Sequence, residues 1–262
     1  TILALFPALL KSLPKSGGWL NSVKVVLGFI EVALGFKFLS TADQTYHWGI
    51  LSRETYLIIW IICFTLLGLY LLGALNRHRV GVPRIVAGLA SLAFVAYMVP
   101  GLRGAPLKAI SGYLPPLRSA VEMTEFYDLD AAEAYAEETG KPLFIDFSGL
   151  GCVNCREMEA RVLTDPEIRR ILRDEYIVVT LYGDDKAEAP EAQWLTTDSG
   201  KVLKTVGKIN SYRMSRDYGI NAQPYYILLG HGRLLAEPRA YDLDIAAFRR
   251  FLEGGLSAQK EL

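Results

Sequence analysis

The chain has 262 residues, 51% of them hydrophobic, and its 28 basic and 28 acidic residues give a net charge of zero. That balance would argue against a nucleic-acid-binding protein or a polybasic membrane-surface protein if the charges were evenly spread, and three cysteines are too few for a disulfide-stapled scaffold. The charge is nevertheless divided, because residues 1–118 carry 11 Lys and Arg against 3 Asp and Glu, whereas residues 119–262 carry 17 against 25. An apolar, basic first half and an acidic second half predict a membrane region followed by a soluble domain.

Three apolar stretches predict membrane-spanning helices at about residues 19–40, 56–75 and 85–102. The second has twenty residues without a charge, which at 1.5 Å per residue is enough to cross a hydrocarbon core of about 30 Å. The third is uncharged over eighteen residues and ends near Pro100, where a helix kinks or stops.

The first apolar stretch is less clear, because it contains Lys24, Glu31 and Lys37 and could form a soluble amphipathic helix. Lys24, Gly28, Glu31 and Gly35 fall on one narrow face, and the remaining surface is nearly all apolar. A soluble helix needs a wider polar face. We therefore expect a span whose narrow stripe packs against other helices, with its glycines allowing close approach.

The short loops predict the orientation of the spans, since Lys and Arg collect on the cytoplasmic side. The loop Asn76–Arg84 carries three arginines and no acid, and Lys11 and Lys15 precede the first span on the same side. The loop Thr41–Thr55 has no positive excess. The sequence after the third span is therefore expected on the non-cytoplasmic side.

We divide the chain into a membrane region at 1–102, a Gly- and Pro-rich linker at 103–123 and a domain at 124–262. Helical and strand patterns alternate in the domain, which predicts a sheet with helices on both faces. The predicted strands are Pro142–Ser148, Tyr176–Tyr182, Tyr225–Leu229 and Arg233–Ala236, and the predicted helices are Asp130–Thr139, Cys152–Leu163, Pro166–Asp174 and Asp244–Leu256.

The motif that carries chemistry is Cys152-Val153-Asn154-Cys155, directly after a predicted core strand and at the start of a helix. A helix N-terminus stabilises a thiolate, so Cys152 is the expected nucleophile of disulfide exchange. Cys155, one turn later, can then attack the mixed disulfide and release the product. A zinc site would need further paired Cys or His ligands, and His47, His78 and His231 are scattered. A purely structural disulfide is the other alternative.

A second element lies at Gln223-Pro224, before the third strand, where a cis bond would place backbone against the dithiol. The order of strand, CxxC helix, strand, helix, proline, hairpin and closing helix resembles a thioredoxin-like fold. Asp146, six residues before Cys152, matches the buried carboxylate that such proteins place behind the dithiol as a proton acceptor. Glu159 resembles a second acid near the same site, although a solvated helix residue is the alternative.

Together with the three spans, the segment Leu13–Gly28 and the CVNC motif followed by Glu157 and Glu159 resemble the thiol:disulfide interchange protein DsbD family, in its last membrane helices and its C-terminal domain. The resemblance implies no bound cofactor other than the redox-active disulfide Cys152–Cys155. It also implies electrons that come from cytoplasmic thioredoxin through a cysteine pair in upstream membrane helices.

The same resemblance implies that the electrons pass to periplasmic thiol-disulfide proteins, with a part in cytochrome c biogenesis. The bacterial inner membrane, with the C-terminal domain in the periplasm, is the implied location, and the lipid bilayer rather than nucleic acid is the implied contact.

The sequence departs from this family in several ways. It lacks the membrane cysteine pair, and Cys63, its one intramembrane cysteine, is expected to be a packing residue. Gly151 stands where relatives commonly have Trp, and the segment Gly183–Asn210 is long for a connection in this fold. Because the sequence begins at Thr1 without an initiator Met, we expect it to start inside a longer protein, with residues 3–10 as the end of an earlier span.

The leading hypothesis is a membrane-anchored thiol:disulfide reductase that acts through Cys152 and Cys155, with Asp146, Glu159 and Pro224 completing the catalytic site. An oxidase or isomerase is the alternative within the enzymes, because Val-Asn between the cysteines does not fix the direction of exchange. A non-enzymatic assembly or delivery module that holds Cu(I) on the two thiols is the alternative outside them.

Overall fold

A computed structural model describes residues 18–75 and 80–261 of the chain, which divides into two compact units. One, here called the helix unit, holds the residues up to Phe36 together with Ile58–Val99. The other, the α/β unit, holds Lys37–Leu57 and Pro100–Leu262. The boundaries predicted at residues 102 and 124 separate membrane from non-membrane sequence and stay predictions.

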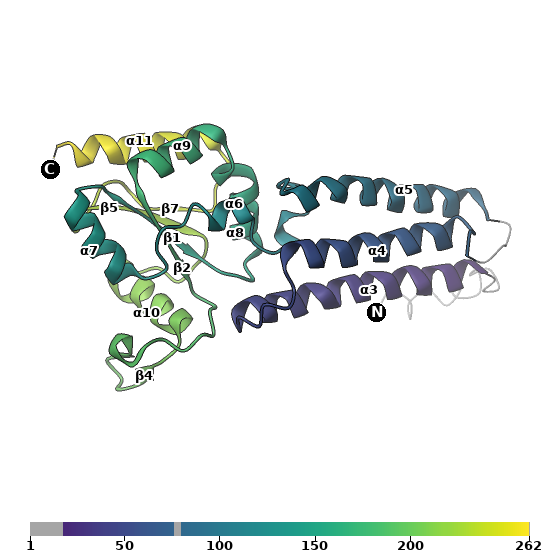
Figure 1. The fold of residues 1–262 in the computed structure, drawn as a ribbon, viewed down its shortest axis with the longest axis horizontal. Coiled ribbons are helices and arrows are strands. Elements are labelled where there is room, and N and C mark those ends of the chain that lie inside the picture. The colour runs from purple at the N-terminus through teal and green to yellow at the C-terminus, as the bar shows by residue number, and fades with distance from the viewer. Residues whose placement is uncertain (1–17, 76–79, 262) are drawn as a thin grey trace, which may run out of the picture. The chain divides into compact units, whose positions relative to one another are not determined.

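Three long apolar helices are the first elements of the described residues: α3 (Gly18–Thr45), α4 (Arg53–Leu71) and α5 (Val82–Met98), the last extended by the 3₁₀ turn η1 (Val99–Arg103) (Figure 1). Within them, Leu20–Thr45, Arg53–Leu71 and Val82–Arg103 are long and apolar enough to cross a membrane. The three predicted spans are therefore confirmed as long apolar helices. Lys11, Lys15, Arg77, Arg79 and residues 3–10, on which we based other predictions, lie outside the described residues.

In the helix unit, α4 and α5 approach each other through glycine. A Cβ atom on Gly68 would lie 2.8 Å from Leu92, and one on Gly88 would lie 2.8 Å from Leu72 and 3.1 Å from the carbonyl oxygen of Gly68. Ser91 Oγ donates a hydrogen bond of 2.7 Å to the carbonyl oxygen of Phe64. Small residues and a hydroxyl that bonds across the interface are the means by which membrane helices associate.

The polar stripe of α3 has no packing partner among the described residues, so its predicted contact with other helices stays a prediction. Among the described residues, no neighbouring heavy atom lies within 4 Å of the Cβ position of either Gly28 or Gly35. Glu31, between them, is exposed. The glycines that allow close helix packing are thus Gly68 and Gly88, which the sequence pattern did not single out, because it shows a helix face but not the partner of that face.

The α/β unit is built on a mixed sheet in the order β2-β1-β5-β6, with β7 pairing to β5. Strands β1 (Leu143–Ser148) and β2 (Ile177–Tyr182) are parallel, and β5 (Tyr225–Gly230) runs antiparallel to β1. The short strands β6 (Arg233–Leu234) and β7 (Arg239–Ala240) complete it. In this register Asp146 lies opposite Thr180 on one side and Tyr226 on the other.

Helices cover both faces of the sheet, because successive side chains of a strand point to opposite sides. One core joins Phe144, Val178 and Leu228 to α9 (Pro166–Glu175) and α11 (Ile245–Gln259). The other joins Ile145, Val179 and Ile227 to α7 (Leu129–Thr139) and α10 (Val206–Tyr218). Figure 1 shows α9 with α11 and α7 with α10 as these two layers. The predicted thioredoxin-like arrangement of a sheet between helices is confirmed.

Local signals fix the ends of several of these helices. The Asp128 side chain accepts hydrogen bonds from the backbone amides of Asp130 and Ala131 at the start of α7, and Gly140 ends that helix with a φ of 69°. Asp165 caps α9 in the same manner, and Pro166 occupies its first position. Such caps satisfy amides that have no partner inside the helix, which is why the sequence predicted these ends well.

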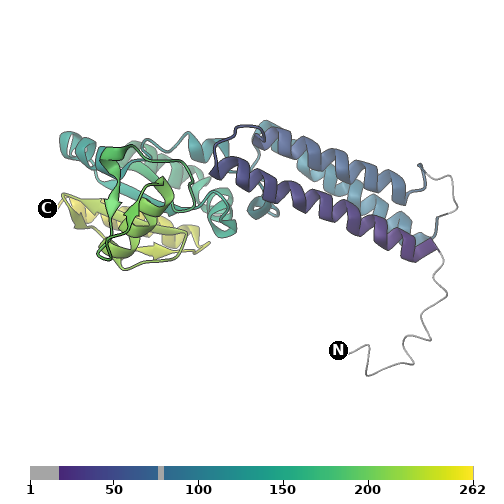
Figure 2. The ribbon, with the colours of Figure 1, turned by 90° about the horizontal axis from the view of Figure 1, so that it is seen from below.

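The connection after β2 differs from the prediction. The long connection after β2 ends at Thr205 instead of Asn210, because α10 begins at Val206. It also contains a small hairpin of β3 (Leu195–Thr196) and β4 (Val202–Leu203), after the 3₁₀ turn η4 (Glu191–Gln193). Figure 2 shows the ribbon of this region beside α10. The weak apolar periodicity of α10 hid it from the sequence analysis.

The segment predicted as a linker is packed in the structure. It forms the 3₁₀ turn η2 (Ser111–Tyr113) and the short helix α6 (Arg118–Val121), and it buries Leu114 and Leu117. A Cβ atom on Gly112 would lie 2.5 Å from Val153, the residue after Cys152. Part of this Gly- and Pro-rich sequence is therefore a wall of the dithiol region.

Candidate functional site

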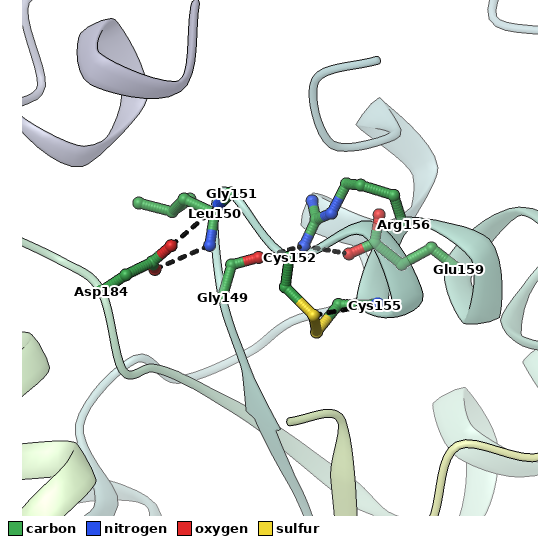
Figure 3. Close-up of a disulfide and its surroundings, with 8 residues drawn as sticks. All are labelled: Gly149, Leu150, Gly151, Cys152, Cys155, Arg156, Glu159 and Asp184. Atoms are coloured by element: carbon green, nitrogen blue, oxygen red, sulfur yellow. Dashed lines mark hydrogen bonds and ion pairs between the residues drawn. A yellow bond between two sulfur atoms is a disulfide. The ribbon is translucent and has the colours of Figure 1, made fainter. Parts of the chain in front are cut away.

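The dithiol lies where β1 ends and α8 (Val153–Met158) begins (Figure 3). Cys152 is the N-cap residue of α8, and its sulfur accepts a hydrogen bond of 3.2 Å from the backbone amide of Cys155. The two residues form a disulfide with their Cα atoms 5.3 Å apart. Cys152 is half-buried and Cys155 only 2% exposed. The free helix amides thus face the more accessible sulfur, which is the arrangement that stabilises a thiolate.

The loop before Cys152 is held by Asp184, which follows β2. The two carboxylate oxygens of Asp184 accept hydrogen bonds of 2.7 and 2.8 Å from the amides of Leu150 and Gly151. Figure 3 shows both bonds on the side of the loop away from Arg156. Because β1 and β2 are parallel, their carboxyl ends meet at one edge of the sheet, and this brings together residues 33 and 34 positions apart.

Gly151 occupies a confined position. A Cβ atom there would lie 2.8 Å from Cγ2 of Thr41 and 3.4 Å from a carboxylate oxygen of Asp184. Thr41 belongs to the α/β unit, in the C-terminal part of α3. Since 2.8 Å is too short for two carbon atoms, any larger side chain at residue 151 requires Thr41 to move.

Pro224 lies at the start of β5, and the Gln223-Pro224 peptide bond is cis. The Gln223 side chain lies close to the carboxyl ends of β1 and β2, because a Cβ atom on Gly149 would be 2.5 Å from its Oε1, and one on Gly183 would overlap its Nε2. The predicted proline segment therefore lies at the same edge of the sheet as the loop that leads to the dithiol.

Asp146 is buried in the middle of β1 and is 6% exposed. Its Oδ1 has no hydrogen-bond partner among the described residues. Burial and the neighbouring charge of Glu159 raise the pKa of Asp146 to about 8, against an opposing effect of Arg156. A carboxyl group in this state gains or loses a proton near neutral pH, as a proton acceptor for a thiol must.

Glu159 is buried as well, which removes the alternative of a solvated helix residue. It begins η3 (Glu159–Leu163), a π-helical turn that continues α8, where we predicted one regular helix from Cys152 to Leu163. Burial raises the pKa of Glu159, and Arg156 opposes this rise. Glu159 and Asp146 line the same small cavity of about 10 Å³, together with Thr180 and Tyr182.

The sequence analysis missed Arg156 and Asp184. Arg156 is 2% exposed, and its Nη2 lies 2.8 Å from Glu159 and 3.1 Å from the carbonyl oxygen of Gly149. The spacing of Arg156 and Glu159 is an available signal, since residues three apart share a helix face. It does not reveal burial, because most such pairs are exposed. Asp184 left no signal, since its bonds depend on how two strand ends meet.

Among the described residues, no group of three or more His, Cys, Asp or Glu side chains is placed to hold a metal ion. Cys63 is a free, half-buried cysteine in α4. Neither observation adds a second candidate centre within the residues 18–75 and 80–261.

Comparison with known proteins supports the redox interpretation. Residues 122–207 match a family described as thioredoxin-like. The thiol:disulfide interchange protein DsbD 1 of Pseudomonas aeruginosa is 29% identical over 171 residues, covering 60% of this chain and 27% of the relative. The DsbD of Neisseria meningitidis serogroup B is 30% identical over 205 residues, covering 72% of this chain and 32% of the relative.

A solved structure of a DsbH oxidoreductase is 17% identical to this chain, and the match covers 51% of this chain and 85% of that structure with a TM-score of 0.40. The chain spans between about a quarter and a third of the length of the curated relatives it matches. The resemblance to thiol:disulfide interchange proteins is confirmed by these relatives.

Proposed function

From the homology of this chain to the DsbD family over most of its length, we propose that it is the membrane-anchored reductase part of a thiol:disulfide interchange protein. The observation that carries the proposal is the asymmetry of the dithiol. Cys152 caps a helix and is partly accessible, whereas Cys155 is buried, and the site includes a carboxyl group, Asp146, with a pKa of about 8.

In the proposed reaction the Cys152 thiolate attacks a disulfide of the acceptor protein. The acceptor's S–S bond breaks, one acceptor sulfur leaves as a thiolate that takes a proton from water, and the other is held by Cys152 as a mixed disulfide. Cys155 then gives its thiol proton to the Asp146 carboxylate and attacks Cys152. The Cys152–Cys155 disulfide forms, the second acceptor sulfur leaves, and two electrons have passed to the acceptor.

For another turnover, the Cys152–Cys155 disulfide must receive two electrons. We propose that these come from a cysteine pair in membrane helices upstream in the complete protein, and ultimately from cytoplasmic thioredoxin. Glu159 acts in this proposal as the charged neighbour that keeps the pKa of Asp146 high, and the segment around Pro224 forms a side of the acceptor site.

The proposed location is the bacterial inner membrane, with the α/β unit in the periplasm and periplasmic disulfide proteins as acceptors. It rests on the three apolar helices and on the arginines of the loop between the second and third. In intact spheroplasts, a membrane-impermeant maleimide should modify reduced Cys152. Modification only after the membrane is permeabilised would place the unit in the cytoplasm.

Trapping tests the exchange reaction. In cells that contain the complete protein, Cys155→Ala should accumulate mixed disulfides through Cys152, because the resolving thiol is missing. The control Cys152→Ala/Cys155→Ala should trap nothing. If Cys155→Ala also traps nothing, the exchange role is wrong.

The reduction potential of Cys152–Cys155 tests the direction of exchange. A value near that of thioredoxin, about −270 mV, supports a reductase, whereas one near about −120 mV identifies an oxidant. Tight Cu(I) binding by the reduced chain without disulfide turnover would instead select the copper-holding module.

A further inference from the structure

Arg156 is a charged side chain that the proposed exchange reaction does not use, although it follows Cys155 directly. Its side chain is 1% exposed. Enclosing a guanidinium group is costly, and the cost is offset only when its donors and its charge are well matched. Here Nη2 serves both the carbonyl oxygen of Gly149 and the carboxylate of Glu159, whereas Nε and Nη1 have no partner among the described residues.

The two groups bound by Arg156 belong to different parts of the site. Gly149 starts the loop that leads from β1 to Cys152, and Glu159 shares a small cavity with Asp146. Figure 3 shows the guanidinium group between the Gly149 carbonyl and the Glu159 carboxylate, beside the turn that carries Cys152. One buried cation therefore links the position of the dithiol loop to the charge of the carboxyl pair.

We propose that Arg156 is a positioning residue of the exchange reaction, which fixes the Gly149 loop and sets the pH at which the buried pair of Asp146 and Glu159 gives up its protons. This inference rests on the proposed function, because it assigns the pair the task of accepting the Cys155 proton. A cation in contact with a carboxyl pair favours its ionised forms, whichever of the two acids holds the remaining proton.

Other charged and titratable groups face this cluster from the elements around it. They are Lys37 of α3, Arg53 of α4, Tyr127 before α7, Asp146 of β1, Tyr182 and Asp184 at and after the end of β2, and Tyr226 of β5. Arg53 and Lys37 also carry positive charge, but Arg53 donates its hydrogen bond to the carbonyl oxygen of Pro115. Among the described residues, Arg156 is the cation that forms an ion pair with Glu159.

Arg161 provides a matched control in the same helical segment. Its Nε lies 2.9 Å from Glu157, four residues away, but its side chain is 40% exposed. Both arginines thus pair with a glutamate of their own helix, and they differ in burial and in contact with the dithiol loop. Removal of Arg161 therefore controls for the loss of an arginine–glutamate pair from this segment.

The test measures single-turnover reduction of oxidised glutathione by the reduced 262-residue chain in detergent, from about pH 5 to about pH 9. The rate should increase with pH as the carboxyl pair ionises, and we call this increase the rising limb. In Arg156→Met we expect the rising limb to move to higher pH by about one unit or more, because the ionised carboxylates lose their neighbouring cation. Arg156→Lys retains the charge and should recover most of the shift, with a lower plateau rate because an ammonium group lacks the planar fork of donors. Arg161→Met should leave the limb in place.

A second readout does not depend on exchange. The infrared band of protonated carboxyl groups, assigned with Asp146→Asn and Glu159→Gln, should titrate at higher pH in Arg156→Met than in the unchanged chain. If Arg156→Met does not fold, both measurements are made on Arg156→Lys instead. An unchanged limb and an unchanged infrared titration in a folded variant would overturn the role of Arg156.

The two proposals fail in different ways. An unchanged chain that never reduces glutathione contradicts the proposed function, whereas an active chain whose pH dependence ignores residue 156 contradicts only this inference. Equal shifts in Arg156→Met and Arg161→Met would also overturn it, because they would show an effect of helix charge in general.

Discussion

The two compact units place their polar and apolar side chains in opposite ways. In the helix unit, Leu27, Ile62 and Val86 are each more than half exposed. In the α/β unit, Asp146, Arg156 and Glu159 are almost completely buried. An apolar surface suits a lipid environment, whereas a buried charge is unfavourable unless it is matched or used. The buried charges of the α/β unit, rather than the charged groups of the helix unit, are therefore the ones available to the proposed exchange reaction.

The largest expected effect on the rate of glutathione reduction is in the α/β unit, in the variant Asp146→Asn. Loss of a proton acceptor should slow glutathione reduction at neutral pH by about 100-fold. Asp198→Asn, which removes an exposed carboxylate of the same unit, should leave the rate unchanged. Equal rates in Asp146→Asn and the unchanged chain would contradict this contrast between the units, because a deeply buried acid of the α/β unit would then have no chemical role.

The raised pKa of Asp146 also predicts how the stability of the unchanged chain and of Asp146→Asn should differ with pH. Burial and Glu159 raise the pKa of Asp146 to about 8 from its ordinary 3.8. Between these values the folded chain holds a proton that the unfolded chain has lost, so the free energy of unfolding falls as the pH rises toward 8. Asp146→Asn lacks this term and should be more stable than the unchanged chain at alkaline pH, by a few kcal/mol. Thermal unfolding at acid and alkaline pH measures the difference.

A smaller effect is expected at Gly151, which is confined by a single methyl group. Gly151→Ala should destabilise the chain by about 1 kcal/mol, because the new Cβ would lie 2.8 Å from Cγ2 of Thr41. Thr41→Ser removes this methyl group and keeps the hydroxyl that donates to the carbonyl oxygen of Lys37. In Gly151→Ala/Thr41→Ser the loss should largely disappear. Purely additive effects in thermal unfolding would contradict the contact.

The smallest effects are expected in the helix unit. Glu31 is exposed in the structure, and Cys63 is a half-buried cysteine that forms no disulfide. Glu31→Gln and Cys63→Ser should each change glutathione reduction by the 262-residue chain by less than about twofold. A large loss in either variant would show that side chains of the helix unit also take part in the reaction.

Much of the site could be predicted because its signals are local. The spacing of Cys152 and Cys155 at the start of a helix, the carboxylate of Asp146 inside an apolar strand and the proline before β5 are readable along the chain. Each is a short pattern in which the type of residue by itself indicates a chemical role. The sequence did not predict α10, whose apolar periodicity is weak, or the packing of the segment before α6, whose Gly and Pro content indicated a linker.

The sequence by itself determined the three apolar helices, the approximate ends of α7 and α9, the alternating strands and the place of the dithiol, because hydrophobic periodicity and capping act over a few residues. Only the tertiary structure decided that Asp184 holds the loop before Cys152, that Arg156 and Glu159 are buried together, and that Gly68 and Gly88 bring two helices into contact. These features depend on which strand ends and helix faces pack together. The same packing buries the charged side chains, and burial is what shifts their pKa values.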